Sequence, residues 1–295
     1  MFNFQRLILF LLFLCIGPLA NAQVEYPLVD DSIDVVIVSH PKDKNTVELC
    51  IDGIQQNCSQ IRRLIVVSSE PLTDKAEWFD EALFPFSKED VTLAIGRGKS
   101  LVAKSFFMHK SHRNPGWYYQ QLLKLYSGFV IPGISSNVLV IDADTVFLNP
   151  VEFMNPETYG GLFCFTTFDK VKPYISAFNR YISHAKRLLP GYKRVYPEYY
   201  SISHHMLFQK PILEDLFSTV EKQHKKRFWK AFCASVDLNE GGASEYEIYF
   251  NFALTRTKQV AIRPLKWINS PDLNKRGEYQ EEGYHFASFH TYLRK

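Results

Sequence analysis

The feature that most constrains the fold is a buried-strand pattern that runs directly into two aspartates. Residues 138–141 are apolar and mostly β-branched, which is typical of a strand covered on both faces. Asp142 and Asp144 follow, and residues 149–150 (Asn-Pro) end the segment with a turn. Two carboxylates at i and i+2 of an extended chain point to one side and repel each other. A shared divalent cation, Mg²⁺ or Mn²⁺, would neutralise that repulsion. The alternative interpretation is that the two aspartates form a solvated acidic turn after a core strand.

Composition narrows the classes of protein that the chain can represent. The 295 residues are 46% hydrophobic, enough for one substantial core. The formal net charge of +3 shows no concentrated basic footprint, so we expect no nucleic-acid partner. We found no repeat, low-complexity tract or linker, and therefore predict one domain over residues 23–295.

Residues 1–22 resemble a secretory signal peptide. Arg6 precedes an apolar run over residues 7–16, and residues 20–22 (Ala-Asn-Ala) offer a cleavage site. The run is shorter than the ~20 residues that span a bilayer, and no later segment is long and apolar enough. We therefore expect an exported protein, periplasmic or secreted, without a transmembrane span in the mature chain. An uncleaved amino-terminal anchor is the alternative.

The cysteines of the mature chain permit disulfides in an oxidising compartment. Four remain after removal of the leader: Cys50, Cys58, Cys164 and Cys233. Cys50 and Cys58 are eight positions apart in one predicted helix, where a local bridge is plausible. No C-x-x-C motif occurs, which argues against a zinc cluster.

Strand and helix patterns alternate through the first half of the sequence. This order predicts an α/β fold with a mostly parallel central sheet flanked by helices. The predicted strands and helices are as follows: strands at 34–39, 63–69, 91–95, 138–141, 162–166, 206–208 and 260–265; helices at 45–56, 101–109, 117–126, 174–189, from Pro211 onward and at 244–255.

Polar residues follow three of the predicted strands at their carboxyl ends, where open α/β sheets bind ligands. They are Ser39-His40, residues 68–70 (Ser-Ser-Glu) and the aspartate pair. Trp117, Gln121 and Lys124 share one face of a helix, which suits either a sugar or phosphate surface or a partly exposed amphipathic helix. If a diphosphate binds at this edge of the sheet, it could be reached by three cationic side chains, those of Arg97, Lys99 and Lys104. The Gly98-Lys99-Ser100 triplet lacks the earlier glycine of a phosphate loop, which excludes a P-loop NTPase.

Two further groups of residues carry titratable side chains. Ser244 and Glu247 have the spacing of a capping box, which leaves Glu245 free to act as a general base or to be a solvated first-turn carboxylate. His204 and His205 precede a strand and must face opposite ways, so we expect at least one to be a core histidine.

With these motifs in order, the chain resembles the nucleotide-diphospho-sugar transferases of the GT-A fold, and most closely a little-characterised bacterial branch. The likeness rests on residues 35–39, on Gly116-Trp117 with Gln120-Gln121, on residues 138–150 and on residues 244–247. It implies a metal-dependent glycosyltransferase that moves a sugar from a nucleotide-diphosphate donor to an acceptor hydroxyl of a carbohydrate or glycoconjugate.

The resemblance also assigns roles to particular positions. It places Asp142 and Asp144 on Mn²⁺ or Mg²⁺ and makes His285 or His290 a further metal ligand. Glu245 is the expected base. The residues expected to shape the donor and acceptor pocket are His40, Glu70, Arg97, Trp117 and Gln121.

Two other classes of function remain open at this stage. A secreted carbohydrate-binding or host-interacting protein on the same scaffold would explain export without a donor supply. A phosphatase of the haloacid-dehalogenase type also begins with a strand and Asp-x-Asp, its first aspartate attacking phosphorus. That class needs a later acidic pair, which is missing after Asp144.

Overall fold

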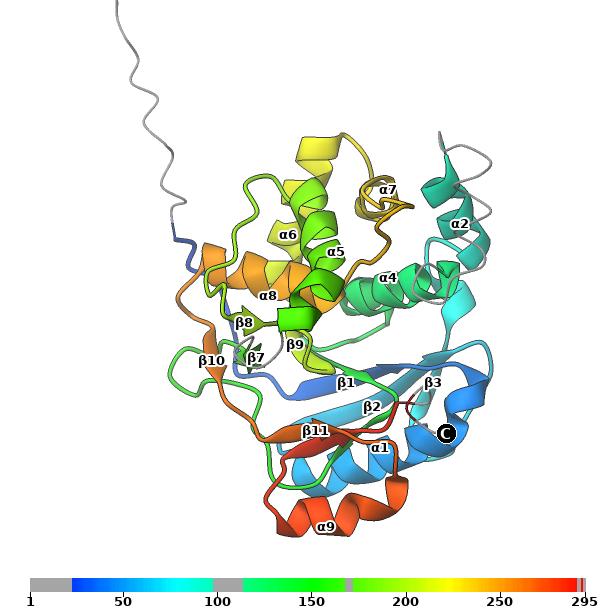
Figure 1. Cartoon of the computed structure of the whole chain (residues 1–295), viewed down its shortest axis with the longest axis vertical. Coiled ribbons are helices and arrows are strands. Elements are labelled where there is room, and N and C mark those ends of the chain that lie inside the picture. The colour runs from blue at the N-terminus through cyan, green and yellow to red at the C-terminus, as the bar shows by residue number, and fades with distance from the viewer. Residues whose placement is uncertain (1–22, 98–113, 168–171, 291–292, 294–295) are drawn as a thin grey trace, which may run out of the picture.

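The computed structural model describes residues 23–97, 114–167, 172–290 and 293. Its centre is a five-stranded sheet whose strands are parallel except for the last, which confirms the predicted α/β class. In spatial order these strands are β3 (Glu77–Asp80), β2 (Ile61–Ser68), β1 (Ile33–Val38), β4 (Asn137–Asp142) and β9 (His205–Gln209). The two aspartates therefore follow a strand in the interior of the sheet (Figure 1).

Helices cover both faces of this sheet (Figure 1). One face carries α1 (Lys44–Asn57), and α9 (Arg276–Glu281) lies beyond it, where Tyr279 packs with Val146, Leu148, Ala287 and Phe289 instead of the central sheet. The other carries α2 (Lys88–Gly96), α4 (Pro115–Val130), α5 (Lys172–Leu188), α6 (Lys210–His224), α7 (Phe228–Ala234) and α8 (Glu245–Arg256). Short 3₁₀ turns occupy Pro41–Asp43, Glu81–Leu83 and Leu273–Lys275.

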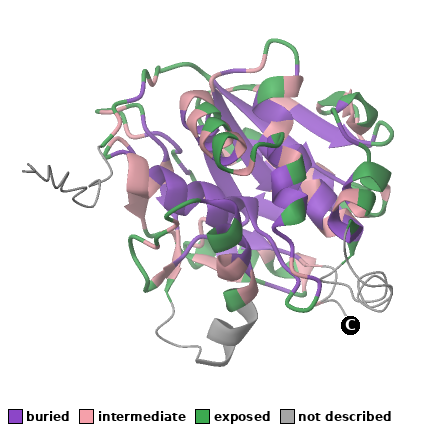
Figure 2. Ribbon diagram, turned by 90° about the horizontal axis from the view of Figure 1, so that it is seen from above, coloured by how far each residue is buried: buried purple, intermediate pink, exposed green. Residues whose placement is uncertain are grey.

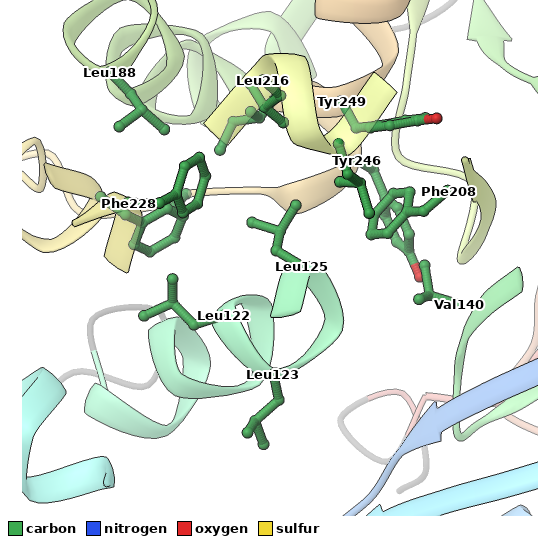
Figure 3. Close-up of a cluster of buried hydrophobic side chains, with 14 of the residues drawn as sticks. Leu122, Leu123, Leu125, Val140, Leu188, Phe208, Leu216, Phe228, Tyr246 and Tyr249 are labelled. Carbon is green, nitrogen blue, oxygen red and sulfur yellow. The ribbon is translucent and has the colours of Figure 1, made fainter. Parts of the chain in front are cut away.

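Alternating side chains of the strands divide the core into two layers. Val138 and Val140 of β4 pack with α4, α6, α7 and α8, whereas Leu139 and Ile141 pack with α1. Because both faces are covered, β1, β4 and β9 are buried almost throughout, whereas β3 and the first half of β2 are more exposed (Figure 2). In the larger layer Tyr246 and Tyr249 of α8 lie over the sheet near Val140 (Figure 3).

Shorter strands build three small sheets beside the main one. The sheet next to the aspartates has the order β11 (Trp267–Asn269), β12 (Phe286–Ser288) and β5 (Thr145–Phe147), with β12 antiparallel to β5. The other two pair β10 (Ala261–Arg263) with β6 (Leu162–Cys164), and β7 (Thr166–Thr167) with β8 (Tyr199–Tyr200).

The structure corrects two local predictions. Residues 91–95 belong to helix α2 rather than a strand, because Ser87 and Asp90 form a capping box that starts the helix just before them. Cys50 and Cys58 form no bridge, and both are free, as are Cys164 and Cys233. Eight residues of helix separate Cα atoms by about 12 Å, beyond the reach of a disulfide. The predicted helix at 101–109 lies outside the described residues.

The remaining predicted elements are confirmed within a few residues of their expected limits. In the part of the chain that the structure describes, no helix has the length and apolar character that crossing a membrane requires.

Candidate active site

The site is at the carboxyl ends of the parallel strands, as predicted. Strands β1, β2 and β4 end at Val38, Ser68 and Asp142, and all three run in the same direction. Asp142 is the last residue of β4, and Asp144 follows in the tight turn that leads into β5. Each aspartate side chain retains 23% of its accessible surface, so neither is splayed into solvent nor fully enclosed.

Asp142 is held on both of its carboxylate oxygens. The Lys124 ammonium contacts Oδ1, and the Tyr246 hydroxyl donates to the same oxygen over 3.1 Å. His204 Nδ1 lies 3.3 Å from Oδ2. Burial alone would raise the pKa of Asp142, but Lys124 and His204 outweigh it and hold that pKa well below its ordinary value. Asp142 is therefore a carboxylate at neutral pH.

Lys124 joins this carboxylate to a second one. Its Nζ lies 2.6 Å from Glu245 Oε1, and the Lys124 and Glu245 side chains are each only 2% exposed. Burial lowers the pKa of Lys124, yet the two carboxylates raise it overall, so the ammonium stays charged. Burial raises the pKa of Glu245 above its ordinary value despite Lys124. The expected base is thus enclosed and paired with an ammonium ion.

Asp144 has a different partner, which comes from a distant part of the chain. Its Oδ2 lies 2.8 Å from His290 Nδ1. Strand β12 pairs with β5, and the backbone N–H of Phe289 then donates to the carbonyl of Asp144 over 2.8 Å. This register places His290, the residue after Phe289, beside the second aspartate.

His204 completes a group of two aspartates and two histidines. Its ring centroid is 4.8 Å from that of His290 and 5.2 Å from that of Trp267. His204 also has a positive φ of 63°, which non-glycine residues adopt rarely and which clusters at functional sites. The next residue, His205, turns into the core among Phe147, Phe153 and Phe286, and its burial lowers its pKa to about 3.

The structure does not bring His285 to this site. His285 precedes β12 whereas His290 follows it, so the strand separates them by its length. The Nδ1 of His285 accepts a hydrogen bond from the backbone of Lys266. Of the two histidines offered as metal ligands, only His290 contacts an aspartate of the pair.

The capping box expected at α8 is half formed. Ser244 accepts a hydrogen bond from the backbone N–H of Glu247, as expected of an N-cap. The Glu247 carboxylate does not return to the backbone of Ser244. It accepts hydrogen bonds from Tyr192, Ser201 and Asn251 instead, and it is fully buried.

The residues expected to shape a pocket fall into two groups. His40, Glu70 and Arg97 are exposed, and His40 caps the following turn by accepting from the backbone of Lys42. Trp117 and Gln121 instead fasten α4 to the segment before α8. The Trp117 indole donates to the carbonyl of Ala243, and the Gln121 side chain accepts from the backbone N–H of Glu245. Lys99 and Lys104 lie outside the described residues.

Sequence reasoning missed the two groups that hold Asp142 in place. Lys124 was read with Trp117 as part of an outer surface, whereas its ammonium points inward to two carboxylates. Tyr246 was not singled out at all. The available signal was that α4 is apolar on nearly every side, so a lysine within it requires a buried counter-charge.

The donor set is suited to a divalent cation that also binds a phosphate ligand. In the described part of the chain, no three His, Cys, Asp or Glu side chains converge to hold a metal ion on their own. Mg²⁺ and Mn²⁺ at phosphate sites commonly take only one or two carboxylates from the protein, with substrate oxygens and water completing the shell. Asp144 and His290 supply such a partial shell, with Asp142 alongside.

One cavity lies away from this site. It has a volume of about 610 Å³ and is lined near the start of β2 by residues that include Arg62, Arg63 and Glu77. Ligands of α/β sheets bind at the opposite, carboxyl edge. Its arginines are paired with Asp34 and Glu77, so their charges are already compensated.

Comparison with known proteins places the chain in a family. It belongs to a family of unknown function, DUF6492, whose model matches residues 35–269. No curated protein matches it. The matched range contains both aspartates, Lys124, His204 and Glu245 but ends before His290.

Several solved structures are similar to this chain over most of its length. Mouse xyloside xylosyltransferase 1 in its apo form is 11% identical, with a TM-score of 0.41 over 90% of this chain and 100% of its own. Galactosyltransferase LgtC with donor and acceptor sugar analogues is 11% identical, with a TM-score of 0.44 over 87% and 86%. The bifunctional glycosyltransferase WbbM is 12% identical, with a TM-score of 0.42 over 91% of this chain and 47% of its own. The names of all three describe glycosyltransferases.

Proposed function

We propose that this protein is a divalent-cation-dependent glycosyltransferase that moves a sugar from a nucleotide diphosphate to an acceptor hydroxyl. One observation carries the proposal. Asp144, at the carboxyl edge of the sheet, lies 2.8 Å from His290, and Asp142 stands two residues away at the end of β4. A carboxylate and an imidazole at this edge suit a cation that a diphosphate then completes.

Each residue has a distinct part in this proposal. Asp144 and His290 would hold the cation, which supplies positive charge to the diphosphate as the sugar–phosphate bond breaks. Asp142 keeps its negative charge beside them and fixes His204. Lys124 holds Asp142 and Glu245 in place, so the edge of the sheet is rigid before the donor binds.

The general base requires a movement of Glu245, whose side chain is enclosed beside Lys124. Glu245 would have to leave Lys124 and reach solvent before taking a proton from an acceptor hydroxyl. This burial favours a second candidate, a sugar-binding protein on the same scaffold that does not catalyse transfer. The contacts of Asp142 disfavour the phosphatase reading, because both of its oxygens are already engaged and a nucleophile needs one free.

The test is release of nucleotide from UDP-, GDP- and CMP-sugars, with a panel of sugar acceptors and with Mn²⁺ or EDTA. We expect Mn²⁺-dependent release with at least one donor. The Asp144→Asn variant should lose most of it, at least about 100-fold, a loss within the range seen when electrostatic stabilisation of a leaving group is removed.

Asp52→Asn is the matched control, because Asp52 is a surface carboxylate on α1 that pairs with Lys75. It should retain wild-type turnover. Binding of a donor without nucleotide release under any condition would identify the sugar-binding candidate instead. Equal turnover by Asp144→Asn and the wild type would remove the proposed cation site.

A further inference from the structure

Two carboxylate–imidazole pairs stand side by side at the edge of the sheet. Asp142 pairs with His204, and Asp144 pairs with His290. The two imidazole rings are adjacent, with centroids 4.8 Å apart. The four side chains come from the end of β4, the residue before β9 and the residue after Phe289, so the fold gathers them from three separate segments.

His204 has features that packing alone does not require. Its left-handed backbone is a conformation that L-residues other than glycine adopt at a cost. The residue is only 7% exposed, and its Nε2 has no hydrogen-bond partner among the described residues, although Nδ1 is bound to Asp142. A buried polar atom without a partner is costly, and a missing ion is one of its ordinary explanations.

We propose that His204 is a further ligand of the cation site, and that the site therefore prefers a first-row transition ion to Mg²⁺. This inference rests on the cation-dependent function proposed above. A histidine that donates Nδ1–H to a carboxylate keeps the lone pair of Nε2 for a metal, which is the usual arrangement around metal-bound histidines. Asp142 is then the positioning residue that fixes this tautomer and the ring orientation.

The preference for a transition ion follows from the donor atoms. Imidazole nitrogens suit later first-row ions such as Co²⁺ and Zn²⁺, whereas Mg²⁺ takes oxygen ligands almost exclusively. With His204 and His290 together, nitrogen would supply two donors, and oxygens of a bound diphosphate or of water would complete the shell. The two ring centroids are 4.8 Å apart, so both imidazoles stand at the same edge of the sheet.

The experiment measures metal binding without nucleotide, on the full-length protein. Co²⁺ is titrated while its visible absorption is recorded, and the affinities for Co²⁺, Mn²⁺ and Mg²⁺ are measured by calorimetry. We expect Co²⁺ to bind at least about tenfold more tightly than Mg²⁺. Ligation by imidazole should shift the Co²⁺ absorption away from that of the aqueous ion.

The decisive variant is His204→Asn. Asparagine tolerates the left-handed backbone and can still donate to Asp142, but it lacks the imidazole nitrogen. It should weaken Co²⁺ binding by at least about tenfold, alter the Co²⁺ absorption and leave Mg²⁺ affinity unchanged. His204→Gly, which removes the backbone strain, should show the same loss and guards against a folding defect. His224→Asn is the matched control, because His224 contacts only the carbonyl of Leu188 near the end of α6.

Two results would overturn the inference. One is an unchanged Co²⁺ spectrum and affinity in His204→Asn and His204→Gly. The other is a wild-type protein that binds Mg²⁺ as tightly as Co²⁺. Neither outcome depends on turnover, so failure of the transferase assay with normal Co²⁺ binding would reject the proposed function and leave this site standing.

Discussion

At the scale of single residues, Lys124 is the most consequential side chain of the site. The buried Lys124 ammonium pairs with the carboxylates of Asp142 in β4 and Glu245 in α8. The ammonium and the two carboxylates each need the opposite charge beside them to stay ionised in the interior. Removing one member of such a group leaves an uncompensated buried charge, whereas replacing the whole group can be nearly neutral.

We predict that Lys124→Met lowers the free energy of unfolding by about 3–5 kcal/mol, because Asp142 and Glu245 lose their counter-charge. Urea denaturation at pH 7 measures this loss. The double variant Lys124→Met/Glu245→Gln should be more stable than Lys124→Met alone.

Lys75→Met is the control for this prediction, since Lys75 forms an exposed pair with Asp52. It should cost less than about 1 kcal/mol. A loss of that small size for Lys124→Met would show that the buried charges are not coupled.

A second residue-scale prediction concerns His184 of α5. Burial lowers the pKa of His184 to about 4, although its Nε2 lies 3.0 Å from the carbonyl of Phe232. Between pH 6.5 and pH 4, the His184 imidazole is therefore protonated in the unfolded chain, whose pKa is the ordinary value of about 6.5. In the folded chain the same imidazole stays neutral over this range. The free energy of unfolding should fall between pH 6.5 and 4 by up to about 1.4 kcal/mol per pH unit from this group.

The variant His184→Phe removes the titrating group and should flatten this pH dependence. Denaturation curves at pH 7, 5.5 and 4.5 give the comparison, independently of any absolute loss from the missing hydrogen bond. Parallel curves for the variant and the wild type would show that His184 does not titrate on unfolding.

At the scale of elements, every strand of six or more residues was predicted, whereas the strands of three residues were predicted only in part. The strands β1, β2 and β4 have six to eight residues and long apolar runs, and all were predicted. Strands β5, β11 and β12 have three residues each, too few to show a period, and were not. Helix α2 was taken for a strand because Val91 and Ile95, both buried on one helical face, stand in a short apolar run.

Strand β12 lies between His285 and His290, and we predict that only His290 affects metal binding. His290→Asn should weaken Mn²⁺ binding by at least about tenfold, because it removes the donor beside Asp144. His285→Asn should bind Mn²⁺ like the wild type, since that side chain contacts Lys266.

Electron paramagnetic resonance of free Mn²⁺ measures both affinities directly. Weaker binding in His285→Asn alone would place the site at the other end of β12.

At the scale of the whole molecule, the sequence located the edge of the sheet but not the set of residues that meet there. The order of strand, Asp-x-Asp and turn identified Asp142 and Asp144 without any structure. The partners of those residues lie 18, 62, 104 and 146 positions away in sequence. Contacts over such separations depend on the packing of α4, α8 and β12, which no local pattern encodes.

Thiol chemistry gives a prediction for the molecule as a whole. The four described cysteines are free, and three of them are buried. Burial raises the pKa of Cys50, Cys58, Cys164 and Cys233, which keeps them as unreactive thiols. The thermal unfolding midpoint should therefore be the same with and without a reducing agent. A midpoint that falls on reduction would reveal a stabilising disulfide.

Asp144 and His290 are separated by 146 positions. A ribosome extrudes a polypeptide from its amino end, so the aspartate emerges long before the histidine. Throughout synthesis, and during any translocation of the unfolded polypeptide, the two cation donors stay apart. Under the proposed function, the cation is therefore captured only late in maturation, when β12 docks beside β5.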